Sequence, residues 1–195
     1  MDLINEDKKL FDKYCKKFKY YPPIIPAQKR IIVLGDLHGD FLLTTQLLKL
    51  AKVIDDNHNW IGGSTYVVQV GDQLDSCRPN GSDCSDDIHD KDSEEAEDVK
   101  ILKFMNQLND QANQVNGAVI SLIGNHEIMN AMGNMDYVSK KDIDKFKNYG
   151  DKLNPKIKFN SAKEARIHAF KPGNELGKLL GCSRVPAIII GSFIF

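Results

Sequence analysis

Three short apolar runs rich in β-branched residues divide the first two thirds of the chain. They are residues 30–34, 65–70 and 118–123, and each ends directly before a glycine. A short apolar run bounded by turn residues is typical of a buried strand. We therefore predict a strand at each of these three places.

Segments with helical spacing of apolar side chains lie before and between the predicted strands. Residues 6–19 carry such a pattern, and three prolines between residues 21 and 26 end it. Asp40 is a candidate N-cap for a leucine-rich helix that follows the first strand. Strands that alternate with helices predict an α/β fold.

An acidic segment precedes the next helix. Residues 83–98 contain nine acidic side chains and hardly an apolar one. This composition does not bury a core, so it predicts a solvated insertion. Asp92 and Glu95 have the spacing of a capping box for the next predicted helix, which carries apolar residues along one face from 99 to 108 and ends before Asn116-Gly117.

The last third of the chain has a weaker pattern. We predict helical structure over residues 140–149, a turn at 172–173 and a short helix over 176–180. Residues 185–195 read as a last strand, interrupted by Gly191.

Length and charge limit the organisation and the partners. A chain of 195 residues with 42% hydrophobic content suits one domain. We assign residues 1–29 to an N-terminal helix and linker, and residues 30–195 to the domain. The 26 basic and 27 acidic side chains nearly cancel, so we expect neither nucleic acid nor a membrane as partner. The start of the chain lacks the apolar core of a signal peptide, which predicts a cytoplasmic location.

The four cysteines stand at positions 15, 77, 84 and 182. They are too few and too scattered for a disulfide scaffold, which predicts reduced thiols. Cys77 and Cys84 flank a polar loop and could pair or bind metal, but they lack the Cys-x-x-Cys spacing of zinc sites.

Each predicted strand leads into a short polar block: residues 35–39 (GDLHG), 71–75 (GDQLD) and 124–127 (GNHE). Active sites of open α/β sheets gather at the carboxyl ends of the strands. The blocks offer carboxylate, imidazole and amide donors, which suit a pair of divalent metals.

The spacing within the blocks suggests a role for each side chain. Asp36 and His38 can face one metal, and Asp72 can bridge both. Asn125 supplies an amide oxygen to the second metal. His126 can act as general acid on the leaving oxygen if Asp75 orients it.

The blocks closely resemble the GD-x-HG, GD-x-x-D and GNHE motifs of the phosphoprotein phosphatase family within the calcineurin-like metallophosphoesterases. Within that family the chain is most similar to the Shewanella-like phosphatases, because GNHE continues as Ile128-Met129-Asn130 and a GNMDYV stretch follows at 133–138. The resemblance runs from about residue 30 to the end.

The resemblance implies a four-layer αββα fold, with two facing mixed sheets flanked by helices. It implies phosphoserine or phosphothreonine proteins as substrates, two ions of manganese, iron or zinc, and attack by a metal-bound hydroxide. It also supports the metal ligands Asp36, His38, Asp72 and Asn125, and the acid pair of His126 with Asp75.

Two departures from the family pattern affect this expectation. The family continues its second motif with Arg-Gly, where the arginine binds the substrate phosphate, but this chain has Ser76-Cys77. A serine lacks the bidentate grip of a guanidinium, so Arg78 is the candidate substitute.

The second departure is that a later His-Gly pair and a further histidine of the family are absent, so the C-terminal part of the domain reads as missing. His168 is the only later histidine, and we expect a packing or surface role for it. The second metal then keeps only Asp72 and Asn125, so we expect an incomplete second site, weak activity and an exposed sheet edge. A separately encoded C-terminal half could complement the chain.

Two other functions compete with a serine/threonine phosphatase. The first is a small-molecule phosphoesterase of the dinucleoside polyphosphate hydrolase type, which shares the metal blocks. The second is a non-catalytic remnant or binding module that keeps one metal through Asp36, His38 and Asp72.

Overall fold

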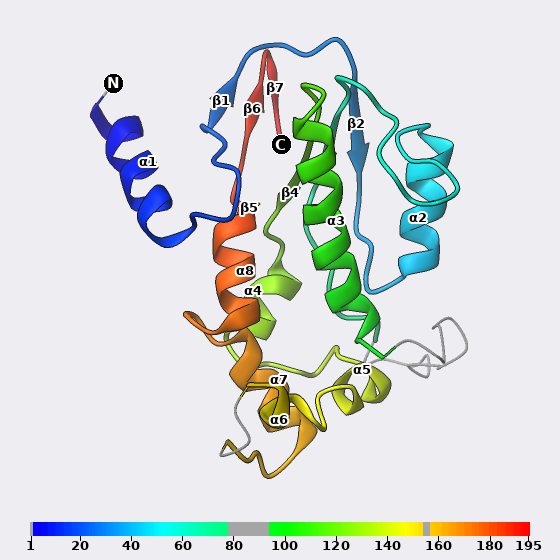
Figure 1. The fold of residues 1–195 in the computed structure, drawn as a ribbon, viewed down its shortest axis with the longest axis vertical. Helices are drawn as coiled ribbons and strands as arrows, with labels where there is room; N and C mark the ends of the chain where they lie inside the picture. The colour runs from blue at the N-terminus through cyan, green and yellow to red at the C-terminus, as the bar shows by residue number, and fades with distance from the viewer. Residues whose placement is uncertain (1, 78–93, 154–156) are drawn as a thin grey trace.

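The computed structural model describes residues 2–77, 94–153 and 157–195 (Figure 1). Within these ranges the helices are α1 (Asp2–Tyr14), α2 (Phe41–Leu50), α3 (Glu97–Asn113), α4 (Asn125–Ala131), α5 (Lys140–Asp144), α6 (Tyr149–Leu153), α7 (Ala162–Phe170) and α8 (Glu175–Ser183). The strands are β1 (Ile24–Ile25), β2 (Ile31–Leu34), β3 (Tyr66–Gln69), β4 (Ala118–Leu122), β5 (Arg184–Val185), β6 (Ile189–Ile190) and β7 (Phe193–Ile194).

The larger sheet has the order β2-β3-β4-β5, and all its strands are parallel. The three predicted strands are its first three members. Their register aligns Ile32 with Val67 and Val67 with Val119. Because neighbouring parallel strands end at the same edge, the three polar blocks are brought together there.

The smaller sheet has the order β1-β6-β7 and joins the two ends of the chain. β1 comes from the predicted linker and pairs parallel with β6, while β7 pairs antiparallel with β6. The prediction of one last strand over residues 185–195 is wrong, because three short strands occupy it. Pro186 offers no amide hydrogen to continue β5, and Gly191 turns the chain with a φ of +62°.

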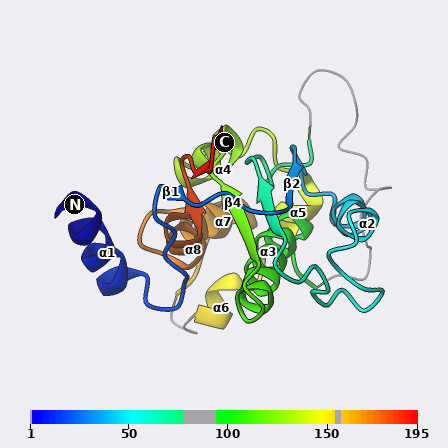
Figure 2. The same ribbon diagram turned by 90° about the horizontal axis from the view of Figure 1, so that it is seen from above.

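The two sheets face each other, and helices flank the larger one, as expected for the fold class. Figure 2 shows α3 and the C-terminal strands on opposite sides of β4. Leu48, Ile101, Met105 and Leu108 are buried between the helices and the larger sheet. The core between the two sheets includes Ile25, Val68, Ile120 and Ile190.

Helices α4 to α7 gather beyond the carboxyl ends of the large sheet, at the lower end of Figure 1. A third core joins α7 to α3 and α8 through Leu102, Phe170 and Leu180, and it includes Phe146 between α5 and α6. Helix α7 was not predicted, although Ser161 and Glu164 form the sequence of a capping box and Ser161 Oγ accepts from Glu164 N at 3.1 Å. Its buried face contains an arginine, which hid the apolar pattern.

The prediction of a solvated insertion is wrong at its end. Glu97 and Asp98 begin α3 and are buried, with 4% and 0% exposure. The predicted capping box does not form, because Ala96 is the N-cap and makes no side-chain cap. Asp92 and the rest of 83–93 lie outside the described residues. Helix α1 exists as predicted but ends at Tyr14.

The prediction of reduced thiols is also wrong. Cys15, just after α1, forms a disulfide with Cys182 near the end of α8, and Cys77 is disulfide-bonded as well. Cys84 lies outside the described residues. The fold brings positions 167 residues apart together, which cysteine spacing in the sequence does not show.

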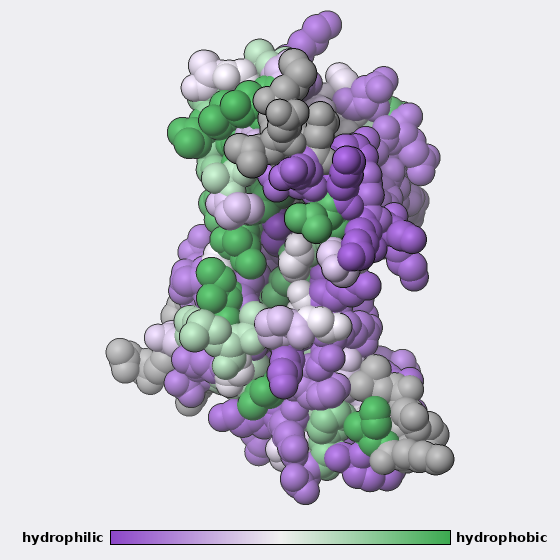
Figure 3. All heavy atoms as spheres, turned by 90° about the vertical axis from the view of Figure 1, so that its left-hand side faces the viewer, coloured by the Kyte–Doolittle hydropathy of each residue, from purple (hydrophilic) through white to green (hydrophobic). Residues whose placement is uncertain are grey.

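Exposed apolar side chains remain on the smaller sheet. Ile24, Phe193 and Ile194 are 62%, 61% and 75% exposed. The face shown in Figure 3 carries apolar side chains along one edge, whereas much of the rest is polar. In the part of the chain that the structure describes, no helix is long and apolar enough to cross a membrane.

Candidate metal centre and acid pair

The first two polar blocks are joined by backbone hydrogen bonds. The amides of Leu37 and His38 donate to the carbonyl of Asp72, at 2.9 and 3.0 Å. His38, Asp72 and Asp75 all adopt positive φ, of 44°, 54° and 68°. Non-glycine residues rarely take this conformation, and such strain clusters at functional sites.

The third block is fixed to the second by Glu127, which the sequence analysis left without a role. Its fully buried carboxylate accepts from four backbone amides, those of Asp72, Gln73, Leu74 and Gly124, at 2.7 to 3.1 Å. A carboxylate is a strong acceptor for several amides at once. Glu127 therefore sets the path of both loops.

A second set of buried side chains supports the loop of residues 71–75. Gln73 donates to Ser121 Oγ at 2.9 Å and accepts from Arg184 Nη2 at 2.6 Å. Burial lowers the pKa of Arg184 to about 10. Sequence reasoning assigned no role to Gln73 or Arg184, because the two residues lie 111 positions apart.

Two predicted metal ligands, His38 and Asp72, lie with the predicted acid His126 around one point at the sheet edge. One donor atom each of His38, Asp72 and His126 lies within 4.8 Å of the other two. Asp36 is more exposed, and its Oδ2 lies 3.4 Å from His38 Nε2. Carboxylate and imidazole donors at this spacing fit a divalent transition metal.

Asn125 begins α4 beside Asp72. With its amide nitrogen turned toward Asp72, that nitrogen lies 3.0 and 3.3 Å from the two carboxylate oxygens. A half-turn of the amide would instead present its oxygen next to the carboxylate, which is a donor set for a cation. The residues present therefore fit a metal, with Asp72 central to both of the predicted sites.

The predicted acid pair is formed and buried. His126 Nδ1 lies 2.8 Å from Asp75 Oδ2, and the side chains are 9% and 1% exposed. Burial raises the pKa of the Asp75 carboxyl above its ordinary value. The ring of His126 meets those of His38 and Tyr137 edge to face, at 4.9 and 5.1 Å.

Ser76 occupies the position where the family motif has its phosphate-binding arginine. Its hydroxyl donates to Asp142 Oδ2 at 3.2 Å, and Ser139 donates to the same oxygen at 2.8 Å. Arg78, the candidate substitute, lies outside the described residues. His168 belongs to α7 and its ring lies 5.1 Å from that of Phe159, a packing contact.

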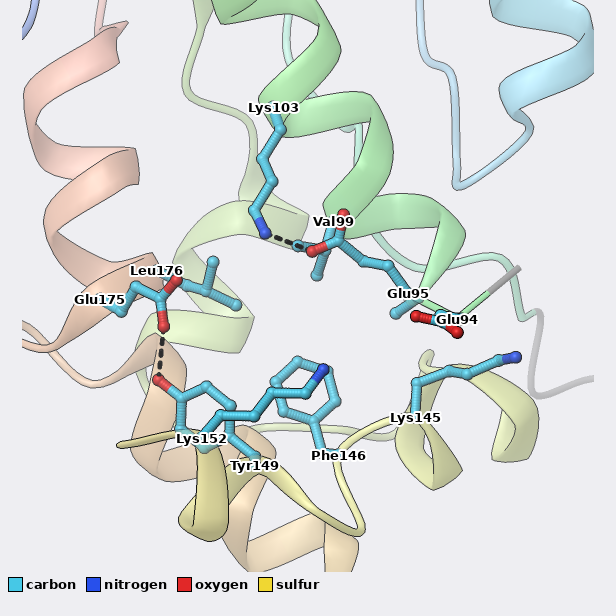
Figure 4. Close-up of a pocket in the computed structure, with 11 residues that line it drawn as sticks. Glu94, Glu95, Val99, Lys103, Lys145, Phe146, Tyr149, Lys152, Glu175 and Leu176 are labelled. Atoms are coloured by element: carbon cyan, nitrogen blue, oxygen red, sulfur yellow. Dashed lines mark hydrogen bonds and ion pairs between the residues drawn. The ribbon is translucent and has the colours of Figure 1, made fainter. Parts of the chain in front are cut away.

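A cavity of about 250 Å³ lies apart from the predicted ligands, between α3, α6 and α8 (Figure 4). Phe146 and Leu176 contribute apolar walls, and Tyr149 points its hydroxyl at Glu175, 3.0 Å away. Lysine and glutamate side chains surround the opening in comparable number. None of the predicted site residues within the described ranges lines this cavity.

Comparison with known proteins gives a consistent family. The sequence profile of the calcineurin-like phosphoesterases matches residues 29–178. The chain is 37% identical to Shewanella-like protein phosphatase 2 of Arabidopsis thaliana over 123 residues, covering 63% of this chain and 27% of that protein. It is 30% identical to Shewanella-like protein phosphatase 1 of Plasmodium berghei (strain Anka), covering 100% of this chain and 44% of that protein.

Solved structures agree with the sequence matches. A crystal structure of a cold-active protein-tyrosine phosphatase from a psychrophilic Shewanella species superposes with a TM-score of 0.64 and 25% identity, covering 90% of this chain and 44% of that one. The chain thus spans less than half the length of these relatives.

Proposed function

Because the chain belongs to the calcineurin-like phosphoesterase family, we propose that it is the N-terminal part of a metal-dependent phosphatase that hydrolyses phosphate monoesters on proteins. The observation that carries the proposal is one arrangement: His38, Asp72 and His126 within 4.8 Å, with His126 held by a buried carboxylate. We propose phosphoserine and phosphothreonine as the phosphorylated residues.

The chain's own side chains would divide the work. Asp36, His38 and Asp72 would hold one metal ion, and Asp72 with Asn125 would hold a second. Bound divalent ions hold phosphate oxygens and lower the pKa of a coordinated water. We propose that the native ions are manganese, iron or zinc.

His126 would carry the proton for the leaving group. Its Nδ1 faces Asp75, so Nε2 is the nitrogen available to the leaving oxygen. Asp75 is buried and fixed, which restricts the imidazole to one orientation.

The second metal site is where we propose that further chain is needed. Asp72 and Asn125 alone are few ligands, and Asn125 is neutral. The two histidines that the family resemblance implies would be supplied by a C-terminal segment, in the same polypeptide or in a separate one.

Two features bear on the choice of substrate. The Shewanella relative is described as a protein-tyrosine phosphatase, so phosphotyrosine is the second candidate. Ser76 stands where the family has its phosphate-binding arginine, which keeps a small-molecule phosphoesterase as an alternative function. Ser76→Arg should tighten inhibition by inorganic phosphate if the ancestor was a phosphoprotein phosphatase, although Asp142 lies close enough to compete for the guanidinium. No gain would favour the small-molecule phosphoesterase.

The cytoplasm is our proposed location, and the disulfide tests it. Disulfides persist mainly in oxidising compartments, so the Cys15–Cys182 disulfide of the structure argues against this location. Alkylation of protein trapped directly from cells should find Cys15 and Cys182 as free thiols if the proposal holds. A pair found oxidised in the cell contradicts it.

The first test of function is manganese-dependent hydrolysis of p-nitrophenyl phosphate by the 195-residue chain, beside Asp72→Asn. The matched control is Asp56→Asn, since Asp56 is fully exposed and pairs only with Lys49 among the described residues. Turnover that Asp72→Asn abolishes and Asp56→Asn keeps supports the phosphatase. Absence of turnover, with one or no manganese ion bound per chain, supports the non-catalytic alternative.

A further inference from the structure

Asn130 lies one turn after His126 on α4 and touches both members of the acid pair. Its side chain is fully buried. Its Nδ2 donates to Asp75 Oδ1 at 2.8 Å and to the carbonyl of His126 at 3.0 Å. Asp75 is therefore held through both oxygens, one by Asn130 and the other by His126.

The orientation of the Asn130 amide is fixed from outside the acid pair. Arg166, on α7, donates to Asn130 Oδ1 through Nη2 at 3.0 Å and through Nε at 3.3 Å. A guanidinium only donates hydrogen bonds, so the atom facing it has to be the amide oxygen. The amide nitrogen consequently faces Asp75.

Arg166 is itself immobilised. It forms a two-bond ion pair with Asp98 at 2.6 and 3.2 Å, and both side chains are 0% exposed. The guanidinium carbon lies 5.3 Å from the ring centre of Phe146 and 4.8 Å from that of Phe170. Without water to compete, this pair has one geometry available.

We propose that Asn130 is a positioning residue for the acid pair, and that the buried Arg166–Asp98 ion pair sets the direction of its amide. This inference rests on the proposed function. With Oδ1 of Asp75 bound to Asn130, Oδ2 is the oxygen that faces His126, and it accepts a hydrogen bond from the Nδ1–H group. The imidazole is held as one tautomer, with Nε2 directed to the leaving oxygen.

If Asn130 only braced the structure of the site, its loss would affect hydrolysis differently from the loss of a positioning residue. Loss of a brace weakens the whole site and slows every substrate alike. Loss of proton donation slows mainly substrates whose leaving group is a poor one, because a good leaving group departs without a proton. Two aryl phosphates that differ only in the leaving phenol separate the two cases.

The test compares Asn130→Leu with the wild-type chain on phenyl phosphate and on p-nitrophenyl phosphate. We expect kcat/KM to fall about tenfold or more on phenyl phosphate, with the loss in kcat, and less than about threefold on p-nitrophenyl phosphate. An equal loss on both substrates, or no loss, overturns the proposal. The matched control is Asn109→Leu, because Asn109 also accepts side-chain and backbone hydrogen bonds, from Tyr21 and Val119, but lies away from the site.

A second measurement needs no activity. Long-range ¹H–¹⁵N NMR spectra report which imidazole nitrogen carries the proton, and the His126 signals are identified by their loss in His126→Gln. In these spectra the wild-type chain should show His126 as the tautomer protonated at Nδ1. Asn130→Leu should give a mixture of tautomers, and an unchanged spectrum overturns the proposal.

The ion pair has its own variant. Arg166→Met alone leaves Asp98 buried and unpaired, which threatens folding, so both are replaced in Arg166→Met/Asp98→Leu. This double variant should shift the His126 tautomer in the same direction as Asn130→Leu. If wild-type protein hydrolyses neither substrate, the proposed function fails, while the NMR spectra still decide the role of Asn130.

Discussion

Gly124 lies so close to Asp72 that no side chain fits between them. A Cβ built on Gly124 would stand 2.2 Å from Asp72 Oδ1, and one on Gly71 would stand 2.7 Å from Gly124 Cα. Gly71 and Gly124, which come from neighbouring motifs, therefore both allow the close approach of the two loops. Their places in the sequence could be predicted as tight turns, but not that they face each other.

Gly124→Ala should push the Asp72 carboxylate away from its proposed position as a metal ligand. A displacement of about 1 Å at a reacting site costs on the order of a hundredfold in rate. We expect at least a tenfold weaker manganese affinity, measured by calorimetry, with a comparable loss of p-nitrophenyl phosphate hydrolysis. Gly181→Ala is the control, since nothing lies within 4 Å of its added methyl group. Equal affinity in both variants would contradict the expectation.

Asp142 should make stability depend on pH. Burial raises the pKa of its carboxyl above the ordinary value of 3.8. Above pH 3.8 the unfolded chain releases this proton while the native chain keeps it, so the native state loses stability until pH passes the raised pKa.

Asp142→Asn removes that loss. The free energy of unfolding of the variant relative to wild type should therefore increase from about pH 4 to pH 7, by about 1.4 kcal/mol for each unit of the pKa shift. Urea titrations at a series of pH values measure it. Asp144→Asn on the same helix, where the carboxylate pairs with Lys147 at the surface, should show no such trend.

At the scale of elements, α4 is the piece that organises the site. Its first turn carries Asn125, His126 and Glu127, and its next turn carries Asn130. The motif sequence predicted roles for Asn125 and His126, but not for Glu127. The role of Asn130 depends on α7, which was not predicted, so no pattern within α4 could show it.

Glu127→Gln should destabilise the fold as well as the site. An amide keeps one oxygen but turns an NH₂ toward backbone donors, which leaves buried amides without an acceptor. We expect about 3 kcal/mol lower free energy of unfolding in urea. Glu164→Gln, which affects an exposed cap of α7, should cost less than about 1 kcal/mol. Comparable losses of unfolding free energy in the two variants would mean that Glu127 stabilises the fold no more than an exposed helix cap does.

At the scale of the whole molecule, the predictable part of the fold is the part built from local patterns. The β-branched runs of the sequence predict strands β2, β3 and β4. Their parallel pairing follows from the helices between them. The Arg166–Asp98 ion pair and the Cys15–Cys182 disulfide join positions 68 and 167 residues apart. Such contacts depend on the finished packing, so neither composition nor spacing revealed them.

The exposed side of the small sheet should promote self-association. Strand β7 lies at a sheet edge and its residues are largely exposed. Apolar edge strands pair readily with other chains, and a lysine blunts them. Ile194→Lys should lower the apparent mass in concentration-dependent light scattering. Leu50→Lys, at an 81% exposed position on a helix, should leave it unchanged. The same mass for Ile194→Lys and wild type would show that this edge does not associate.

The pairing of β1 with β6 has a consequence for biosynthesis. Residues 24–25 leave the ribosome early, but their partners at 189–190 are made 165 residues later. Contacts between such distant positions form late and slowly. Arg184, which fixes Gln73 beside the candidate metal centre, is made 111 residues after Gln73. A nascent chain would thus expose its candidate ligands before these two contacts can order them, and metal capture would follow the synthesis of residues 184–190.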